Sequence, residues 1–290
     1  MLLKNKYIRS KIKKLFFLLK EFLIVVCLDR NLIPIRYFSA KPNVGDALNV
    51  YLIRKISGRE TLEIKSGYFR HILGIGSIMH FGTKKSIVWG SGIIKENQLP
   101  EYSILKKMNF SAVRGVKTRN TLEKKLGESV ACPLGDPAVL MSLFYFPRVH
   151  KEYSIGVVPH YMDKNTIGFK QLLLKLNAHS IDVELPVEDF INDLVKCDVV
   201  FSSSLHGLIL SDTYNIPNLW VKFSDKIIGG NFKFEDYYST TNSRVDSIHP
   251  IDLSSKELDK SYLEELIYKA NISEFTEDKK LLLDAFPFRL

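Results

Sequence analysis

The sequence predicts an α/β protein with two Rossmann-like lobes that face a cleft. Short apolar runs of strand-forming residues alternate with segments of helical periodicity along most of the chain. Polar and glycine residues follow nearly every strand-like run, as in parallel sheets that bind ligands beyond their carboxyl ends. The alternation breaks at residues 146–153, where proline and charged residues interrupt the apolar pattern, and it then starts again.

These observations divide the chain of 290 residues into four segments, a length that accommodates two ordinary domains. Residues 1–30 are expected to form a basic amphipathic helix, and residues 31–148 the first α/β lobe. The second α/β lobe covers residues 149–250, and a helical segment covers residues 251–290. An amphipathic helix over residues 256–270 is expected to return to the first lobe.

The N-terminal segment combines lysines with apolar residues. The apolar stretch Leu15–Leu28 is 14 residues long and contains Lys20 and Glu21, so it is too short and too charged for a membrane span. No small-residue cleavage site follows it, which argues against a signal peptide. Residues 1–28 form either an interfacial helix on an anionic membrane surface or a packing helix with a solvated basic face.

The first lobe is expected to contain five strands and two helices. The helices end at Gly58 and Gly127, because glycine readily adopts the left-handed conformation that follows a helix. The predicted strands are residues 33–38, 71–75, 86–89, 110–113 and 130–132, and the predicted helices are residues 47–56 and 116–126.

The second lobe repeats the pattern and contains the stretch Val199–Val221, which is predicted to form a strand, a tight turn, a helix ending before Pro217 and another strand. Serines 202–204 lie where that helix begins. One of them is expected to cap it, and the neighbouring backbone N–H groups favour an anion. His206 falls in the first helical turn. The other predicted elements are strands 153–158, 181–185 and 198–201 and helices 166–177 and 187–196.

Composition excludes several function classes. The net charge is +9, but the first 20 residues hold seven Lys or Arg and no acid, so the remaining chain is nearly neutral. A nucleic-acid-binding face is therefore not expected. The three scattered cysteines support neither a disulfide framework nor a zinc site, and a reducing cytoplasm is expected. No dinucleotide fingerprint, Walker loop or nucleophile elbow is present, and His71 and His80 lack the spacing of metal ligands.

Several anion-binding groups remain after these exclusions. Arg114 and Arg119 surround a turn, and Lys222, Lys226 and Lys233 lie near a pair of glycines. Together with the serine-rich helix start, they suit a small doubly charged substrate such as a phosphate ester with a carboxylate.

Taken together, the motifs resemble those of the polysaccharide pyruvyl transferase family. They occur in the expected order over about 200 residues. The motifs are Asn43-Val-Gly-Asp46, Val88-Trp-Gly-Ser-Gly92, Val113-Arg-Gly115 with Thr118 and Arg119, Gly135-Asp-Pro-Ala138, Gly156-Val-Val-Pro-His160, Ser202-Ser-Ser-Leu-His-Gly207 and Phe232-Lys-Phe-Glu-Asp-Tyr-Tyr238.

The resemblance implies a fold similar to the two-lobed GT-B glycosyltransferases. It also implies transfer of an enolpyruvyl-derived group from phosphoenolpyruvate to two hydroxyls of a sugar, giving a pyruvate ketal. Phosphoenolpyruvate is then the donor substrate, and no cofactor or metal is expected. The acceptor is a sugar or a lipid-linked oligosaccharide of a cell-surface polysaccharide, handled in the cytoplasm or at the inner face of the membrane.

Family likeness also suggests roles for individual residues. His206 is the expected catalytic acid or base, or else a phosphate contact. Asp46 is expected to bind or activate a sugar hydroxyl, or else caps a helix. Asp136 either assists in this or caps a helix. His160 either lines the acceptor side or is a satisfied structural histidine. The residues expected to bind substrate are Asn43, Gly45, Ser91, Gly92, Arg114, Arg119, Asp136, His160, Ser203, Ser204, Lys226 and Lys233.

One position departs from the family pattern. Many members have arginine immediately before Leu-His, where this chain has Ser204. The work of that arginine then passes to Arg119, Lys226 or Lys233, or the donor differs. Two alternative functions stay open: a GT-B glycosyltransferase that uses a nucleotide sugar, and a non-catalytic protein that binds glycan intermediates for an assembly complex.

Overall fold

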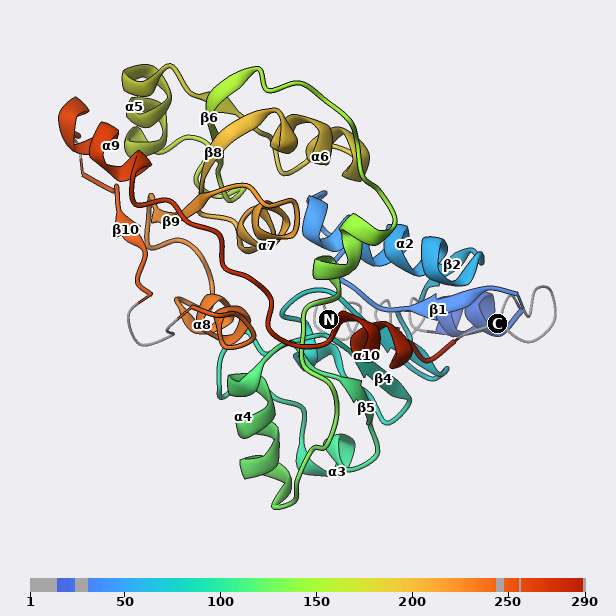
Figure 1. Ribbon diagram of the computed structural model, residues 1–290. Coiled ribbons are helices and arrows are strands. Elements are labelled where there is room, and N and C mark those ends of the chain that lie inside the picture. Colours follow the sequence, from blue (N-terminus) through green and yellow to red (C-terminus); the bar gives the residue numbers. More distant parts are fainter. Residues whose placement is uncertain (1–14, 24–30, 244–247, 256, 289–290) are drawn as a thin grey trace, which may run out of the picture.

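The computed structural model describes residues 15–23, 31–243, 248–255 and 257–288 and contains, within these ranges, two parallel five-stranded sheets (Figure 1). The first sheet has the order β2-β1-β3-β4-β5 and the second the order β10-β9-β8-β6-β7. The first is built from β1 (Ile33–Ile35), β2 (Thr61–Glu63), β3 (His71–Leu73), β4 (Ser86–Trp89) and β5 (Asn109–Ala112). The second is built from β6 (Tyr153–Val158), β7 (His179–Ser180), β8 (Cys197–Ser202), β9 (Asn218–Lys222) and β10 (Ile251–Asp252). The predicted fold of two α/β lobes is confirmed, whereas the likeness to GT-B enzymes stays a prediction.

The helices begin and end where local chemistry favours it. Asn43 caps α2, and its side chain accepts a hydrogen bond of 3.1 Å from the Asp46 backbone N–H. Gly58 ends the same helix with a φ of 63°, a conformation that glycine adopts without strain. The helices of the first lobe are α2 (Val44–Ser57), η2 (Met79–Phe81), α3 (Tyr102–Leu105) and α4 (Val116–Leu126). Those of the second lobe are α5 (Ile167–Leu176), α6 (Val187–Val195), α7 (Leu205–Thr213), α8 (Phe232–Tyr238) and α9 (Lys260–Ile267).

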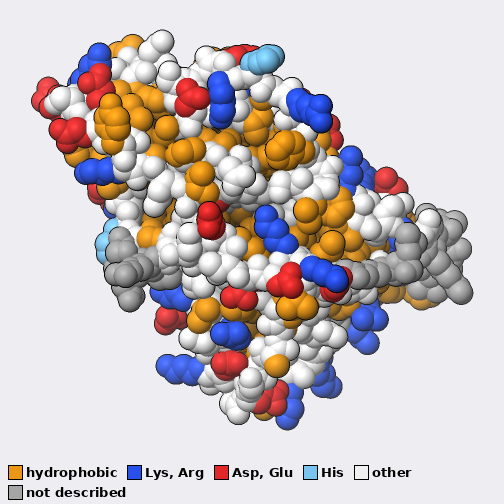
Figure 2. Space-filling model, viewed as in Figure 1, with side chains coloured by type: hydrophobic (Ala, Val, Ile, Leu, Met, Phe, Trp, Pro, Cys, Tyr) orange, Lys and Arg blue, Asp and Glu red, His pale blue; other side chains and the backbone are white. Residues whose placement is uncertain are grey.

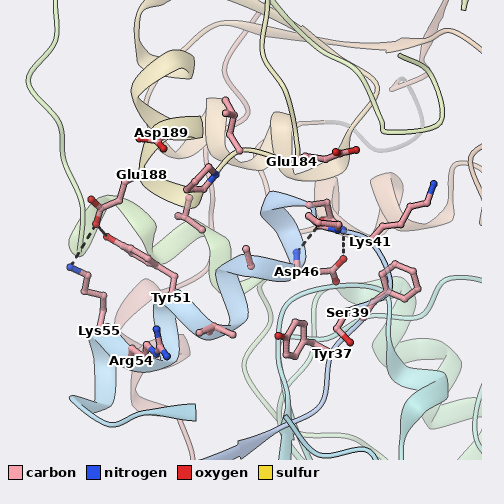
Figure 3. Close-up of a pocket in the computed structure, with 18 residues that line it drawn as sticks. Tyr37, Ser39, Lys41, Asp46, Tyr51, Arg54, Lys55, Glu184, Glu188 and Asp189 are labelled. Carbon is pink, nitrogen blue, oxygen red and sulfur yellow. Dashed lines mark hydrogen bonds and ion pairs between the residues drawn. The ribbon is translucent and has the colours of Figure 1, made fainter. Parts of the chain in front are cut away.

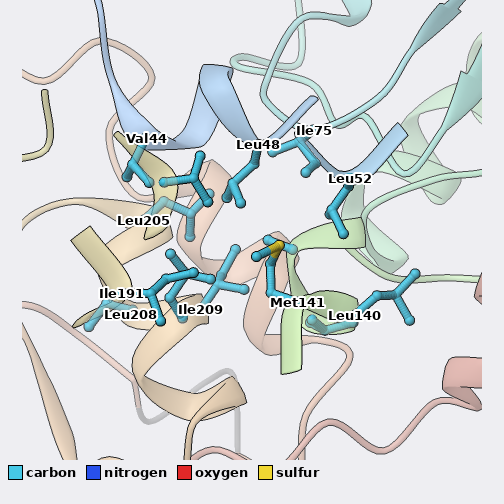
Figure 4. Packing of buried hydrophobic residues seen from close by; sticks show 14 of the residues in the cluster. Val44, Leu48, Leu52, Ile75, Leu140, Met141, Ile191, Leu205, Leu208 and Ile209 are labelled. Atoms are coloured by element: carbon cyan, nitrogen blue, oxygen red, sulfur yellow. The ribbon is translucent and has the colours of Figure 1, made fainter. Parts of the chain in front are cut away.

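One hydrophobic core continues from one lobe into the other. The connecting 3₁₀ segment η3 (Pro137–Leu143) lies in its middle and contacts α2 and α7. Leu140 and Met141 of η3 are fully buried among apolar side chains of both helices (Figure 4). Burial of this apolar area stabilises the arrangement of the lobes as well as each lobe itself. Other members of the cluster are Val44, Leu48, Leu52, Ile191, Leu205, Leu208 and Ile209.

The C-terminal helix α10 (Lys279–Asp284) returns to the first lobe. Trp89 of β4 donates a hydrogen bond of 2.9 Å from its indole nitrogen to the Leu282 carbonyl, and Ser111 donates one of 2.8 Å to the Ala285 carbonyl. The prediction that the helix over residues 256–270 makes this return is wrong. Its counterpart α9 instead packs against α5, burying Leu263 in the core of the second lobe.

Two predicted strands are absent. Residues 181–185 form a turn, because the Asp182 carboxylate accepts a hydrogen bond of 2.8 Å from the Glu184 backbone and bends the chain while Ile181 and Val183 stay buried. Residues 130–132 form no strand, and only an isolated bridge joins Val113 to Leu134. The short edge strand β2 was not predicted.

The described part of the N-terminal segment is a helix over residues 15–22, and the rest of the predicted segment up to residue 30 lies largely outside the described residues. The buried carboxylate of Glu21 accepts hydrogen bonds of 2.7 and 3.0 Å from the backbone of Lys65 and Ser66. These bonds fasten the helix to the first lobe. No helix within the described ranges is long and apolar enough to cross a bilayer.

The surface carries charges of both signs. On the face in Figure 2, basic and acidic side chains are interspersed over both lobes, with hydrophobic side chains between them. This distribution differs from the continuous basic face that a nucleic-acid backbone requires.

Candidate functional site

A pocket of about 730 Å³ lies between the two lobes. Residues that line it follow strands β1, β3 and β4 of the first lobe and β6, β8 and β9 of the second. Carboxyl ends of parallel strands are the usual ligand-binding edge of such sheets. Seven of the predicted site residues line this pocket: Asn43, Asp46, His160, Ser204, His206, Lys226 and Lys233.

The turn between β8 and α7 brings His206 into the pocket. Ser204 is the N-cap residue of α7, but its side chain makes no capping hydrogen bond. Its backbone N–H donates instead to Ser202 Oγ at 3.0 Å, which fixes the turn. The start of α7 therefore lies at the pocket wall without a side-chain cap, an arrangement that favours an anion.

His206 lies between two other segments. Its Nε2 is 3.7 Å from Oδ2 of Asp136, and neither atom has a hydrogen-bond partner among the described residues. The other oxygen of Asp136 accepts a bond of 3.1 Å from the Ala138 N–H and caps η3. On the opposite side, a Cβ at Gly45 would overlap the imidazole ring. Gly45 is therefore required for this position of His206. Asp136 has the capping role that the sequence left open, whereas its part in handling the sugar hydroxyl stays a prediction.

Asp46 lies in the first turn of α2 and faces the same pocket. Its carboxylate accepts a hydrogen bond from the Asn43 amide. Burial raises the pKa of Asp46 to about 6, although this hydrogen bond and the nearby His206 and Lys233 oppose the shift. A carboxyl group with this pKa can exchange a proton close to neutral pH.

His160 is held by a buried hydrogen-bond network. Its backbone N–H donates to Ser203 Oγ at 2.9 Å, and Ser203 donates to Oδ2 of the fully buried Asp163 at 2.8 Å. Ser224 donates to the other oxygen of Asp163 at 2.5 Å. Burial, followed by the charge of Lys233, lowers the pKa of His160 to about 3. His160 is therefore a neutral imidazole, and Ser203 supports its turn rather than lining the pocket.

Two lysines give the pocket positive charge. Lys233, from the first turn of α8, forms no ion pair with any residue that the structure describes. Restricted access to water, followed by the charge of Arg114, lowers the pKa of Lys233 to about 8. Lys226 is exposed at the rim. Over the described ranges, no three His, Cys, Asp or Glu side chains are grouped so as to hold a metal ion.

Arg114 is fully buried and does not line the pocket. Its guanidinium donates to Oδ2 of Asp236 at 2.8 Å, to Ser77 Oγ at 2.6 Å and to the Ile93 carbonyl at 2.9 Å. Asp236 also accepts bonds of 2.7 and 2.6 Å from the Thr118 backbone and hydroxyl. The pair thus connects the first lobe with α8, and Ser77 links it to the pocket wall. Direct substrate binding by Arg114 stays a prediction.

The remaining predicted residues lie behind the pocket or away from it. Ser91 donates to the Gly76 carbonyl at 3.0 Å, and Gly92 leaves room for the Arg114 guanidinium. Arg119 lies on α4 near Cys132, outside the pocket lining. These placements assign Ser91 and Gly92 to the support of the pocket wall.

Three polar residues of the site were not singled out from the sequence. Asp236 lies inside the Phe232–Tyr238 motif, which was its only signal. Ser77 follows β3 and was detectable as a polar residue beyond a strand. Asp163 gave no comparable signal, because only the fold brings Ser203 and Ser224 to its two oxygens.

Comparisons with known proteins show what this chain is similar to. The chain is 27% identical over 220 residues to uncharacterized protein L143 of Acanthamoeba polyphaga mimivirus, covering 72% of this chain and 75% of that protein. It is 26% identical over 219 residues to the succinoglycan biosynthesis protein ExoV of Rhizobium meliloti, covering 71% of this chain but only 64% of ExoV. A crystal structure of an uncharacterized Klebsiella pneumoniae protein superposes with a TM-score of 0.44 and 15% identity, covering 77% of this chain and 93% of that one. The model of the polysaccharide pyruvyl transferase family matches residues 43–225, which is more than half of the chain and includes most of the pocket. The chain therefore belongs to the polysaccharide pyruvyl transferase family.

Proposed function

We propose that the protein is a pyruvyltransferase, which moves an enolpyruvyl-derived group from phosphoenolpyruvate to two hydroxyls of a sugar in a cell-surface polysaccharide or its precursor. The observation that carries the proposal is the meeting of His206, Asp46 and Lys233 in one pocket between the lobes. These groups supply an acid, a base and a cation, which this chemistry needs. The name of ExoV, a succinoglycan biosynthesis protein, supports a polysaccharide acceptor.

The donor is a small anion with a phosphate and a carboxylate. Lys233 and the uncapped start of α7 offer it a charged group and a set of backbone N–H donors. Lys226 at the rim adds a second, more exposed charge. In this arrangement, Lys233 takes over the work of the arginine that many relatives have at the position of Ser204.

His206 is the acid of the first step. The protonated imidazole gives its proton to the methylene carbon of phosphoenolpyruvate, and positive charge develops at the adjacent carbon that carries the phosphate. Asp136, with Oδ2 3.7 Å from Nε2, fixes the ring position. Asp136 is therefore a positioning residue.

Asp46 is the base of the addition step. It removes a proton from the first sugar hydroxyl while that oxygen bonds to the cationic carbon. The carbon–oxygen bond to phosphate then breaks, and the second hydroxyl attacks the same carbon to close the ketal. In the overall reaction the two sugar hydroxyls lose one proton each. One proton ends on the new methyl group and the other on the released phosphate.

The test is incubation of the full chain with phosphoenolpyruvate and a panel of free and lipid-linked glycans. Pyruvylated product in the mass spectrum, with matching release of phosphate, is expected, and the His206→Ala variant should form both about 10²- to 10⁴-fold more slowly. Thermal unfolding separates the other functions, because a ligand at a hundred times its Kd adds about 2.7 kcal/mol of stability. Stabilisation by nucleoside diphosphates instead of phosphoenolpyruvate would favour the nucleotide-sugar glycosyltransferase. Tight glycan binding without any phosphate release would favour the assembly protein.

We also propose that the enzyme is peripheral on the inner face of a membrane. The helix over residues 15–22 and the adjoining Leu23 are fastened to the first lobe through Glu21, yet five large apolar side chains are each about half exposed. These side chains are Leu15, Phe16, Leu19, Phe22 and Leu23. An apolar face next to a lysine-rich chain segment is typical of interfacial helices on anionic lipid.

A further inference from the structure

A second hollow of about 880 Å³ runs from the pocket along α2. Figure 3 shows it between α2 on one side and the turn leading into α6 on the other. Phe38, Asn43 and Asp46 line both hollows, so the second hollow adjoins the first. We call it the α2–α6 groove.

We propose that the α2–α6 groove binds the oligosaccharide chain of the acceptor, several sugars away from the one that is modified. This inference rests on the proposed function and extends it, because it assigns a ligand class to a surface outside the pocket. Asp46 lies where the groove meets the pocket. A glycan lying in the groove therefore presents the hydroxyls of its end sugar to the proposed base.

The chemistry of the groove suits a chain of sugars. Tyr37, Phe38 and Tyr51 give it aromatic surface, against which the apolar faces of sugar rings pack. Carboxylates, phenols and cationic groups all line the groove, and they can donate hydrogen bonds to hydroxyls or accept them. Three basic residues, Lys41, Arg54 and Lys55, face four acidic ones, Asp46, Glu184, Glu188 and Asp189. This near balance disfavours a polyanion such as a nucleotide chain, which needs a clear excess of positive charge.

Several groups of the groove are already positioned, and others are available to a ligand. Tyr51 donates to Oε1 of Glu188 at 2.6 Å, which joins the two walls (Figure 3). The phenol of Tyr37 forms no hydrogen bond with any described residue, and the same holds for the exposed carboxylate of Asp189. The Lys41 ammonium lies 5.0 Å from the centre of the Tyr161 ring, at the junction with the pocket. Such preformed walls with unused polar groups are typical of binding sites.

The experiment measures Kd by calorimetry for a graded series of mono- to octasaccharides from bacterial exopolysaccharides, succinoglycan fragments included. For the wild-type chain, affinity is expected to rise about tenfold or more from the monosaccharide to the tetrasaccharide. The double variant Tyr37→Ala/Asp189→Ala should lose this increase and keep its stabilisation by phosphoenolpyruvate. Tyr68→Ala is the matched control, because Tyr68 is 68% exposed and lies outside the groove. Unchanged melting temperatures would show that both variants fold.

Three results would overturn the inference. The first is a double variant whose affinity rises with oligosaccharide length as much as that of the wild type. The second is a Tyr68→Ala control that loses this rise as the double variant does, and the third is no binding of any oligosaccharide of the series. Failure of the proposed function has a different signature. Length-dependent glycan binding without phosphate release would remove the transferase and retain the groove. Pyruvylation of short acceptors without any effect of chain length would retain the transferase and remove the groove.

Discussion

Asp136 and His206 form a buried carboxylate–imidazole pair, with Oδ2 of one 3.7 Å from Nε2 of the other. Asp136 is the N-cap residue of η3, which connects the lobes, whereas His206 belongs to α7 of the second lobe. Because neither atom has another hydrogen-bond partner in the described chain, each group is the main polar neighbour of the other at this place. The pair couples the position of the proposed acid to the packing between the lobes.

Replacing His206 with alanine should lower kcat by about 10²- to 10⁴-fold, because the proposed proton donor is lost. Phosphate release with phosphoenolpyruvate and an accepted glycan measures this effect, and circular dichroism reports whether the fold is kept. Asp136→Asn should lower kcat less, because it removes only the carboxylate that fixes the position of the His206 ring. Full turnover by His206→Ala would remove His206 from the mechanism.

Gly45→Ala separates activity from stability. The new Cβ would overlap the His206 ring and displace it, so we expect a large loss of kcat. The substitution itself favours the helix by about 0.5–1 kcal/mol. Gly58→Ala is the matched control at the other end of α2, where an added Cβ meets no atom within 4 Å but the φ is 63°. It should cost about 1 kcal/mol of stability and leave activity intact. Full activity of Gly45→Ala together with a large loss of activity in Gly58→Ala would contradict the assigned role of Gly45.

The pH dependence of kcat/KM should be bell-shaped. Burial raises the pKa of Asp46 to about 6, and a base must be deprotonated to act, so activity should fall as the pH drops below about 6. The pKa of Lys233 is lowered to about 8, and donor affinity should fall above it as the ammonium loses its charge. Asp46→Asn should remove the acidic limb. Lys233→Met should weaken donor binding and remove the loss of donor affinity above about pH 8. An acidic limb that persists in Asp46→Asn would assign it to another group.

Much of the fold was predictable because local patterns specify it. The helix α4 was predicted with its observed bounds, since its apolar periodicity ends at Gly127, whose φ of 73° suits glycine. Residues 181–185 misled the prediction, because Ile181 and Val183 alternate as in a strand while the Asp182 side chain imposes a turn. Both are buried in the core shared by the two lobes, and the Val183 carbonyl accepts a hydrogen bond of 2.6 Å from the Val44 N–H of the distant α2, which no local pattern encodes.

Part of the candidate site was also predictable from local sequence patterns. The rule that ligands bind beyond strand ends selected Asp46, His160 and His206, all of which line the pocket. It could not tell that Arg114 is buried, because its partner Asp236 is 122 residues away in the sequence. Long-range ion pairs of this kind are set by how the lobes pack.

Breaking the Arg114–Asp236 pair should destabilise the protein strongly. Both side chains are fully buried, so Asp236→Ala leaves an unpaired charge and should cost about 3–5 kcal/mol of unfolding free energy in urea. The control is Glu264→Ala, which breaks the exposed pair with Lys260 and should cost less than about 1 kcal/mol. The double variant Arg114→Met/Asp236→Leu should recover part of the loss. Equal effects of Asp236→Ala and Glu264→Ala would show that Arg114 is not held mainly by this pair and is available to substrate.

The exposed face of the N-terminal helix provides the last prediction. The full chain should float with anionic phosphatidylglycerol vesicles and much less with neutral phosphatidylcholine vesicles, since each basic residue near an anionic surface contributes about 1 kcal/mol. Phe16→Glu/Leu19→Glu should abolish flotation by placing charge on the apolar face, where these side chains are 63% and 54% exposed. Leu174→Glu is the matched control, because Leu174 is 84% exposed on α5 in the other lobe. High salt should weaken binding of the wild type through screening. A wild-type chain that stays in the bottom fraction with anionic vesicles would exclude this face as a membrane contact and leave it as a packing surface.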